Sequence, residues 1–322
     1  MTRALLAVSL LLVGCGETNP RGGEAGVDAS TMDAARPDAQ ADVEGTGEWV
    51  LLIRYVHLPD LPPSGSHEVP GMDLDGHVTA SGSDPIGCFF EDWVAPARYV
   101  DTSGVDNQVP DIISAIRGIN DGLDLNRDVE QAIHDLDALL VIRITRIGDP
   151  LDDGEVDVAL FQVDLVGEPV YEMVTVDGET LELLAPNQTF RVQADSLIDG
   201  RPRTQMMNAS LRGGRLYTPG TSFSLRIPAR DMRTIELELD GMQVGGRVSE
   251  TTLESGLVAG YVRVEDVPAT IASLNLPTPP DMATVDSIAS SLADIDVDGD
   301  GPCEAISIGL QVEGVAASLV FP

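Results

Sequence analysis

The chain has 322 residues, of which 53 are acidic and 19 are basic, so its formal net charge is −34 at pH 7. All 19 basic residues are arginine, and the absence of lysine excludes phosphate-loop lysines, kinase ATP sites and pyridoxal Schiff bases, which need an ammonium group. The negative charge excludes nucleic acid as a partner, while a hydrophobic share of 43% supplies enough apolar material for a sizeable core.

The first fourteen residues predict a signal peptide. Arg3 precedes an apolar run at 4–13, which is about half the length that spans a bilayer as a helix. The sequence Leu-Val-Gly-Cys at 12–15 resembles the lipobox of bacterial lipoproteins, which implies a diacylglycerol on Cys15 as the only membrane attachment. In that group an Asp after the cysteine causes retention at the inner membrane. Gly16 stands there, so we expect anchoring in the outer membrane, facing the periplasm or the cell surface.

Residues 15–47 predict a flexible acidic tether behind the lipidated cysteine. They are rich in Gly, Ala, Asp, Glu, Pro and Thr and contain almost no large apolar side chain. Such a segment buries too little surface to offset its ordering entropy, and a coil of about 30 residues reaches roughly 30 Å. No break in composition occurs between 48 and 322, which predicts a single domain there, with two packed β units as the alternative.

The folded part predicts many short strands and few helices. The apolar run at 49–58 and the alternating stretches at 235–240 and 306–313 indicate strands. A change of apolar parity within 156–165 predicts a strand with a β-bulge near Leu160. Further strands are expected at 138–147, 188–198, 206–217, 221–227 and 256–264, and helices near 112–119, 129–136 and 282–292, the last capped by Asp281. This pattern predicts a mostly β fold, a β-sandwich or jelly roll with a few short helical insertions.

The densest chemical signal is the sequence Asp-Val-Asp-Gly-Asp-Gly-Pro-Cys-Glu at 296–304. In calcium loops, carboxylates at alternate positions converge on the cation and a Gly at position six turns the backbone. A register that starts at Asp296 places Gly301 sixth and Glu304 ninth, whereas one that starts at Asp294 places Pro302 ninth, so we prefer the first. Position twelve is then Ser307 instead of Glu, and one ligand must come from elsewhere. The predicted Ca²⁺ ligands are Asp296, Asp298, Asp300 and Glu304.

A second acidic segment can supply the missing ligand. Its candidate ligands lie between residues 73 and 107 and are Asp73, Asp75, Asp92, Asp106 and Asn107. The alternative for both segments is an acidic turn without a cation, because Asp, Asn and Gly are common turn residues.

Two cysteines remain once Cys15 is lipidated. Cys88 and Cys303 form an even pair in an oxidising compartment, which predicts a disulfide bond. It would close a loop of more than 200 residues, contribute about 4 kcal/mol in the chain-entropy model, and hold the two acidic segments in one neighbourhood. The alternative, a nucleophilic cysteine beside a histidine, lacks any local Cys-His motif.

A combination of motifs resembles a group of secreted lipoproteins from myxobacteria and their relatives. The resemblance extends over about 48–322 and implies one architecture, but it brings no assigned activity. The residues that carry it are Leu74-Asp75-Gly76, Asp84-Pro85, Cys88, Asp92, Gly104-Val105-Asp106-Asn107-Gln108, Asp298, Gly299, Gly301, Cys303, Ala305, Ile306, Ser307 and Gly309.

Two functional hypotheses follow. The four histidines lack the HExxH spacing of zinc enzymes, and no GxSxG serine motif occurs. The favoured hypothesis is an envelope-anchored, calcium-stabilised, non-catalytic binding, adhesive or scaffold module whose protein or glycan partner is unspecified. The alternative is a hydrolase of polysaccharide or another extracellular polymer that uses unassigned carboxylates.

Overall fold

The computed structural model describes residues 47–64, 66–76, 91–99, 104–119, 124–176, 178–228, 234–268, 281–298 and 302–322. Several predicted features lie outside these ranges: the signal peptide, Cys15, the tether up to residue 46, Cys88 and Asp300.

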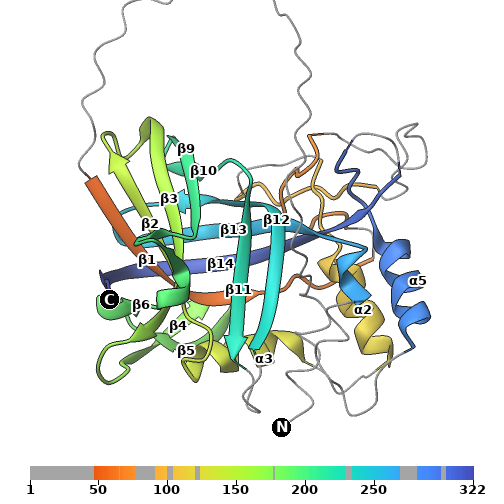
Figure 1. Cartoon of the computed structure of the whole chain (residues 1–322), viewed down its shortest axis with the longest axis horizontal. Coiled ribbons are helices and arrows are strands. Elements are labelled where there is room, and N and C mark those ends of the chain that lie inside the picture. Colours follow the sequence, from red (N-terminus) through yellow and green to blue (C-terminus); the bar gives the residue numbers. More distant parts are fainter. Residues whose placement is uncertain are drawn as a thin grey trace, which may run out of the picture.

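Eight antiparallel strands form one closed, barrel-like sheet (Figure 1). The sheet closes because β14 pairs with β1, and β9 pairs with β3. The first and last strands of the described chain are therefore neighbours. In order around the sheet the strands are β1 (Gly47–His57), β2 (Leu140–Ile147), β3 (Asp152–Leu165), β9 (Thr204–Arg212), β10 (Arg215–Tyr217), β12 (Thr234–Val248), β13 (Thr252–Arg263) and β14 (Ala305–Val320).

The largest apolar cluster draws buried side chains from all eight of these strands. On β1, for example, Leu51 and Ile53 belong to it, while Leu52 between them belongs to a second cluster. This alternation follows from the two-residue period of a strand, which sends neighbouring side chains to opposite faces. The first cluster therefore fills the closed sheet, and the second covers the outside of β1–β3.

Burial on both faces explains the parity change in β3. Val158 and Leu160 belong to the inner cluster, whereas Phe161 and Val163 belong to the outer one. Leu160 pairs with Ile142 in an uninterrupted ladder with β2. The β-bulge predicted near Leu160 is therefore wrong, because a strand that is covered on both sides needs no register shift to bury both parities. The irregularities of β3 lie earlier, between residues 153 and 158, where it pairs with β9.

The remaining strands extend or cover the closed sheet. β6 (Gln188–Val192) lies between the ends of β3 and β14, and β11 (Thr221–Pro228) pairs with β12. The hairpin of β4 (Tyr171–Val176) and β5 (Glu179–Leu184) was not predicted. A 3₁₀ turn at Ala194–Ser196 precedes the short pair β7 (Leu197–Ile198) and β8 (Arg201–Pro202).

The single strand predicted at 206–217 is instead the hairpin β9–β10. Gly213 and Gly214 both have positive φ, 58° and 72°, and glycine adopts this conformation without steric cost. Two consecutive residues of this kind favour a tight hairpin turn. Apolar residues occur on both sides of the turn, at Ala209 and Leu211 before it and at Leu216 after it, so apolar content alone did not separate the two strands.

Among the described residues, the longer helices that accompany the sheet lie close to the predicted ranges. They are α2 (Val109–Ile119), α3 (Leu125–His134) and α5 (Met282–Leu292). Figure 1 shows α2 and α5 together at one end of the sheet, and α3 packs on β1. Asp124 caps α3 by accepting a hydrogen bond from the Arg127 amide, and Asp281 is the N-cap residue of α5. No helix in the described ranges is both long enough and apolar enough to cross a membrane.

The mostly β prediction is confirmed, with few helices. The sheet differs from the predicted sandwich, since the eight strands join into one closed sheet where a sandwich has two separate layers. Alternation identifies which residues of a strand are buried, but it does not say which strands pair. The two closing pairings join strands far apart in the sequence and carry no local signal.

Candidate metal centre

The segments around residues 67–76, 91–99 and 104–108 pack on the outside of the closed sheet. Isolated bridges join Met72 to Asp106 and Trp93 to Val105. Met72 and Val105 also share an apolar cluster with Leu257 of β13. These contacts bring the two ends of the second acidic segment together.

Asn107 fixes this segment to β14. Its Nδ2 donates to the carbonyls of Pro70 and Gly309, and its Oδ1 accepts from the amides of Val109 and Gly309. A Cβ atom at Gly309 would lie 2.6 Å from Asn107 Nδ2, so the close approach requires glycine. The two accepted bonds occupy both lone pairs of Oδ1. Asn107, predicted as a ligand, therefore acts as a structural residue.

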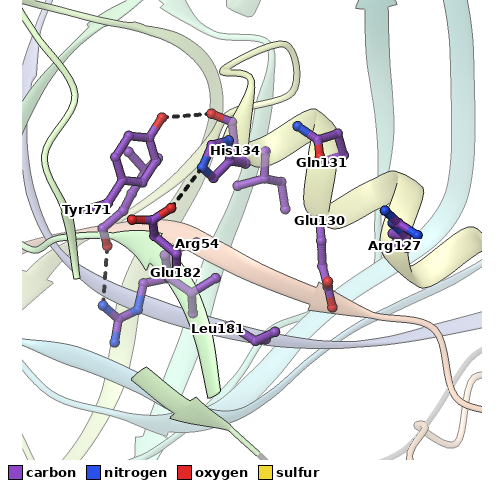
Figure 2. A pocket seen from close by; sticks show the side chains of 11 residues that line it. Arg54, Arg127, Glu130, Gln131, His134, Tyr171, Leu181 and Glu182 are labelled. Carbon is purple, nitrogen blue, oxygen red and sulfur yellow. Dashed lines mark hydrogen bonds and ion pairs between the residues drawn. The ribbon is translucent and has the colours of Figure 1, made fainter. Parts of the chain in front are cut away.

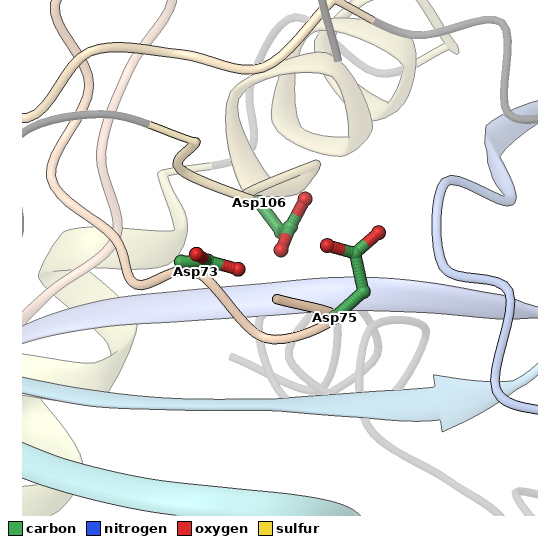
Figure 3. A group of neighbouring side chains, drawn as sticks. All are labelled: Asp73, Asp75 and Asp106. Atoms are coloured by element: carbon green, nitrogen blue, oxygen red, sulfur yellow. The ribbon is translucent and has the colours of Figure 1, made fainter. Parts of the chain in front are cut away.

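Asp73, Asp75 and Asp106 form the first carboxylate cluster. One carboxylate oxygen from each lies within 4.8 Å of the others, and Figure 3 shows the Asp75 carboxylate pointing toward that of Asp106. The Gly76 amide donates to Asp73 Oδ1 at 2.7 Å, and the Leu74 amide donates to Asp106 Oδ2 at 2.7 Å. The turn at 73–76 and the bridge between Met72 and Asp106 thus bring the three carboxylates together.

Electrostatics at Asp106 are unfavourable for a bare carboxylate. Burial, together with the nearby carboxylates of Asp75, Asp294 and Asp92, raises its pKa from 3.8 to about 9, and the hydrogen bond from Leu74 opposes the shift. Asp106 is only 3% exposed. At neutral pH this carboxyl group holds a proton, and a divalent cation would favour its ionised form.

Asp296, Asp298 and Glu304 form the second cluster, again with one oxygen from each within 4.8 Å. The loop connects α5 to β14, and the bridge between Ile295 and Ala305 closes its base. Glu304 Oε1 also accepts from the Val297 amide at 3.0 Å. Three of the four predicted ligands are therefore brought together. The fourth, Asp300, lies outside the described residues.

Asp294 is close enough to influence Asp106 of the first cluster and stands two residues before Asp296 of the second. It was not predicted as a ligand in either cluster. Its carboxylate accepts from the amide and the hydroxyl of Ser307, and it is 6% exposed. Burial raises its pKa to about 7 against the hydrogen bonds from Ser307 and Gln108. Asp294 in turn raises the pKa of Asp106. The sequence did carry a signal for this buried carboxyl group, because Asp294 stands between two apolar residues in Ala-Asp-Ile at 293–295.

The placement of Asp294 favours the register that begins at Asp296. Its side chain is engaged by Ser307 and is absent from the 296–304 cluster. Asp92, predicted as a ligand, is not in the first cluster either, although it is close enough to raise the pKa of Asp106.

Cys303 lies within the second loop, one residue before Glu304, and is disulfide-bonded. The other cysteines, Cys15 and Cys88, both lie outside the described residues. The pairing of Cys303 with Cys88 therefore stays a prediction.

No family model, curated protein or solved structure matches this chain. The resemblance to myxobacterial lipoproteins also stays a prediction.

Proposed function

We propose that this chain is a calcium-stabilised, non-catalytic binding, adhesive or scaffold module, held at the outer membrane by a lipid on Cys15. The observation that supports the calcium proposal is the convergence of two carboxylate clusters, each with three oxygens within 4.8 Å of one another. Both were expected from the spacing of acids in the sequence.

Repulsion gives the physical reason for a cation. Carboxylates this close oppose one another at any pH at which they are ionised, and the effect is strongest where burial excludes water. A divalent cation between them converts repulsion into attraction. Asp106, which holds a proton at neutral pH, would exchange it for the cation.

Calcium suits these clusters better than magnesium. Ca²⁺ accepts six to eight oxygen ligands in flexible geometry, whereas Mg²⁺ requires a near-ideal octahedron and dehydrates reluctantly. Each cluster supplies three carboxylates from loop residues. Main-chain carbonyls and water would complete the coordination. For the 296–304 loop we also expect one added ligand, an acid of the 73–107 segment.

Thermal unfolding in calcium, magnesium and chelator tests the proposal. A cation that binds only the native state raises its stability by mass action, so the melting temperature should rise with added Ca²⁺, rise less with Mg²⁺ and fall with chelator. Asp199→Asn, an exposed charge removal on the β7–β8 turn, should leave this response unchanged. Identical melting curves in calcium and chelator would refute calcium binding at these clusters.

A further inference from the structure

A pocket of about 220 Å³ lies between α3, β1 and the β4–β5 hairpin. It contains none of the predicted calcium ligands. Its polar lining combines cationic, acidic and aromatic side chains from these three elements: Arg54, Arg127, Glu130, His134, Tyr171 and Glu182. We name it the α3 pocket.

Arg54 is a buried cation in the wall of the α3 pocket. Its side chain is 10% exposed, and its Nη1 donates to Glu172 Oε1 and to the Leu184 carbonyl. These two bonds hold the guanidinium in place. Its Nε is also buried but has no hydrogen-bond partner in the described part of the chain. A buried N–H without an acceptor is costly. Because Nε is itself closed to solvent, a ligand in the pocket would contact the part of the Arg54 side chain that lines the pocket.

One face of α3 forms the opposite wall. Arg127, Glu130 and His134 are three or four residues apart, which places them on the same side of a helix. The His134 ring stacks on Tyr171 with centroids 4.7 Å apart, and the Tyr171 hydroxyl donates to the His134 carbonyl. Figure 2 shows these two rings with the Arg54 guanidinium and Glu182 at one end, and Arg127 and Glu130 further along the helix.

We propose that the α3 pocket binds a small organic acid the size of a sugar acid or an amino acid. Its carboxylate would accept hydrogen bonds from the Arg54 guanidinium, and Arg127 at the rim would add attraction. Glu130 and Glu182 would accept hydrogen bonds from the hydroxyl or ammonium groups of the same ligand. The small volume of the pocket excludes polymers, apart from a single terminal residue of one.

A carboxylate is favoured over a neutral ligand for two reasons. A charged acceptor forms a stronger hydrogen bond with a guanidinium than a neutral oxygen does. The lining also places two arginines beside Glu130 and Glu182 in a protein of net charge −34, so an acid that carries hydroxyl or ammonium groups matches both signs of charge, whereas a neutral ligand matches neither. Because the pocket lies apart from both carboxylate clusters, this proposal does not depend on calcium binding.

Calorimetric titration of the full chain in calcium-containing buffer tests the proposal. The probes are glucuronate, L-alanine, and glucose as the neutral counterpart of glucuronate. We expect at least one of the two acids to bind, with glucose at least about tenfold weaker. Binding of glucuronate alone identifies a sugar acid as the ligand class, and binding of alanine alone identifies an amino acid.

Variants locate the binding. Arg54→Met should weaken binding of the acid at least about tenfold. Arg127→Gln changes an exposed side chain and tests the same pocket if Arg54→Met fails to fold. Arg143→Gln removes an arginine whose partner is Glu48 outside the pocket, and it should leave binding unchanged. Absence of binding by both acids, equal binding of glucose, or equal losses in Arg127→Gln and Arg143→Gln would overturn the proposal.

Discussion

Replacing Asp106 by Asn should stabilise the calcium-free protein at neutral pH and remove most of the stabilisation that calcium gives the first cluster. The Asn side chain keeps an oxygen that can accept from the Leu74 amide, as Asp106 does at 2.7 Å. It carries no charge at any pH, so folding does not require it to bind a proton. It also lacks the second anionic oxygen that a cation would bind.

The magnitude follows from proton linkage. The pKa of Asp106 is about 9 in the folded protein and 3.8 as the reference for the unfolded chain. Between these values the folded state binds more protons than the unfolded state, so stability falls as pH rises. Each pH unit costs about 1.4 kcal/mol, and over the roughly three units up to pH 7 the cost is on the order of 4 kcal/mol. The Asn side chain avoids this cost, so we expect Asp106→Asn to raise the free energy of unfolding by about 1–4 kcal/mol.

Urea unfolding of the wild type, Asp106→Asn and Asp199→Asn measures this effect. In chelator at pH 7, Asp106→Asn should be the most stable of the three, and the wild type should gain stability as the pH is lowered toward 5. In millimolar calcium the advantage of Asp106→Asn should shrink or reverse. A variant that is less stable than the wild type in chelator would refute the reasoning, because it would mean that Asp106 is ionised and favourably paired without a cation.

Four further predictions concern the loop, the packing and the maturation of the chain. Asp298→Ala should reduce the rise of melting temperature with Ca²⁺, and an unchanged rise would remove this residue from the ligands. Gly309→Ala should destabilise by about 1–3 kcal/mol, because its Cβ would meet the Asn107 amide; wild-type unfolding curves would contradict this. Cys15→Ala should release the protein from membrane fractions, and continued retention would rule out the lipid anchor. Non-reducing peptide mapping should find Cys88 linked to Cys303, a result that two alkylated free thiols would exclude.

The carboxylate clusters were predictable because their chemistry is local. Asp296, Asp298 and Glu304 lie within nine residues, and Asp73 and Asp75 lie in one turn. Their spacing alone indicated an oxygen site. The contribution of Asp106 depends on the bridge to Met72, which links positions 34 residues apart in the sequence. Asp106 was nevertheless predicted as a ligand, because acidic residues are dense in the 73–107 segment.

Features that depend on distant pairing were not predictable. The closure of the sheet joins β1 to β14, and no local pattern states that these strands are neighbours. The role of Asn107 was missed for the same reason, since its partner Gly309 is 202 positions away. The α3 pocket assembles Arg54, α3 and a hairpin that was not predicted. Arg54 gave one hint, a charge inside an apolar run at 49–58 that had been assigned to a buried strand.

The central claim is that the carboxylate clusters bind calcium. Calorimetric titration of the chelator-treated protein with calcium at pH 7 tests it most directly, with the titration repeated in two buffers of different ionisation enthalpy. We predict at least one bound Ca²⁺ per chain, with protons released on binding because Asp106 gives up its proton to the cation. The apparent affinity should rise with pH toward 9. No saturable heat in either buffer, together with no calcium retained on equilibrium dialysis, would contradict the account.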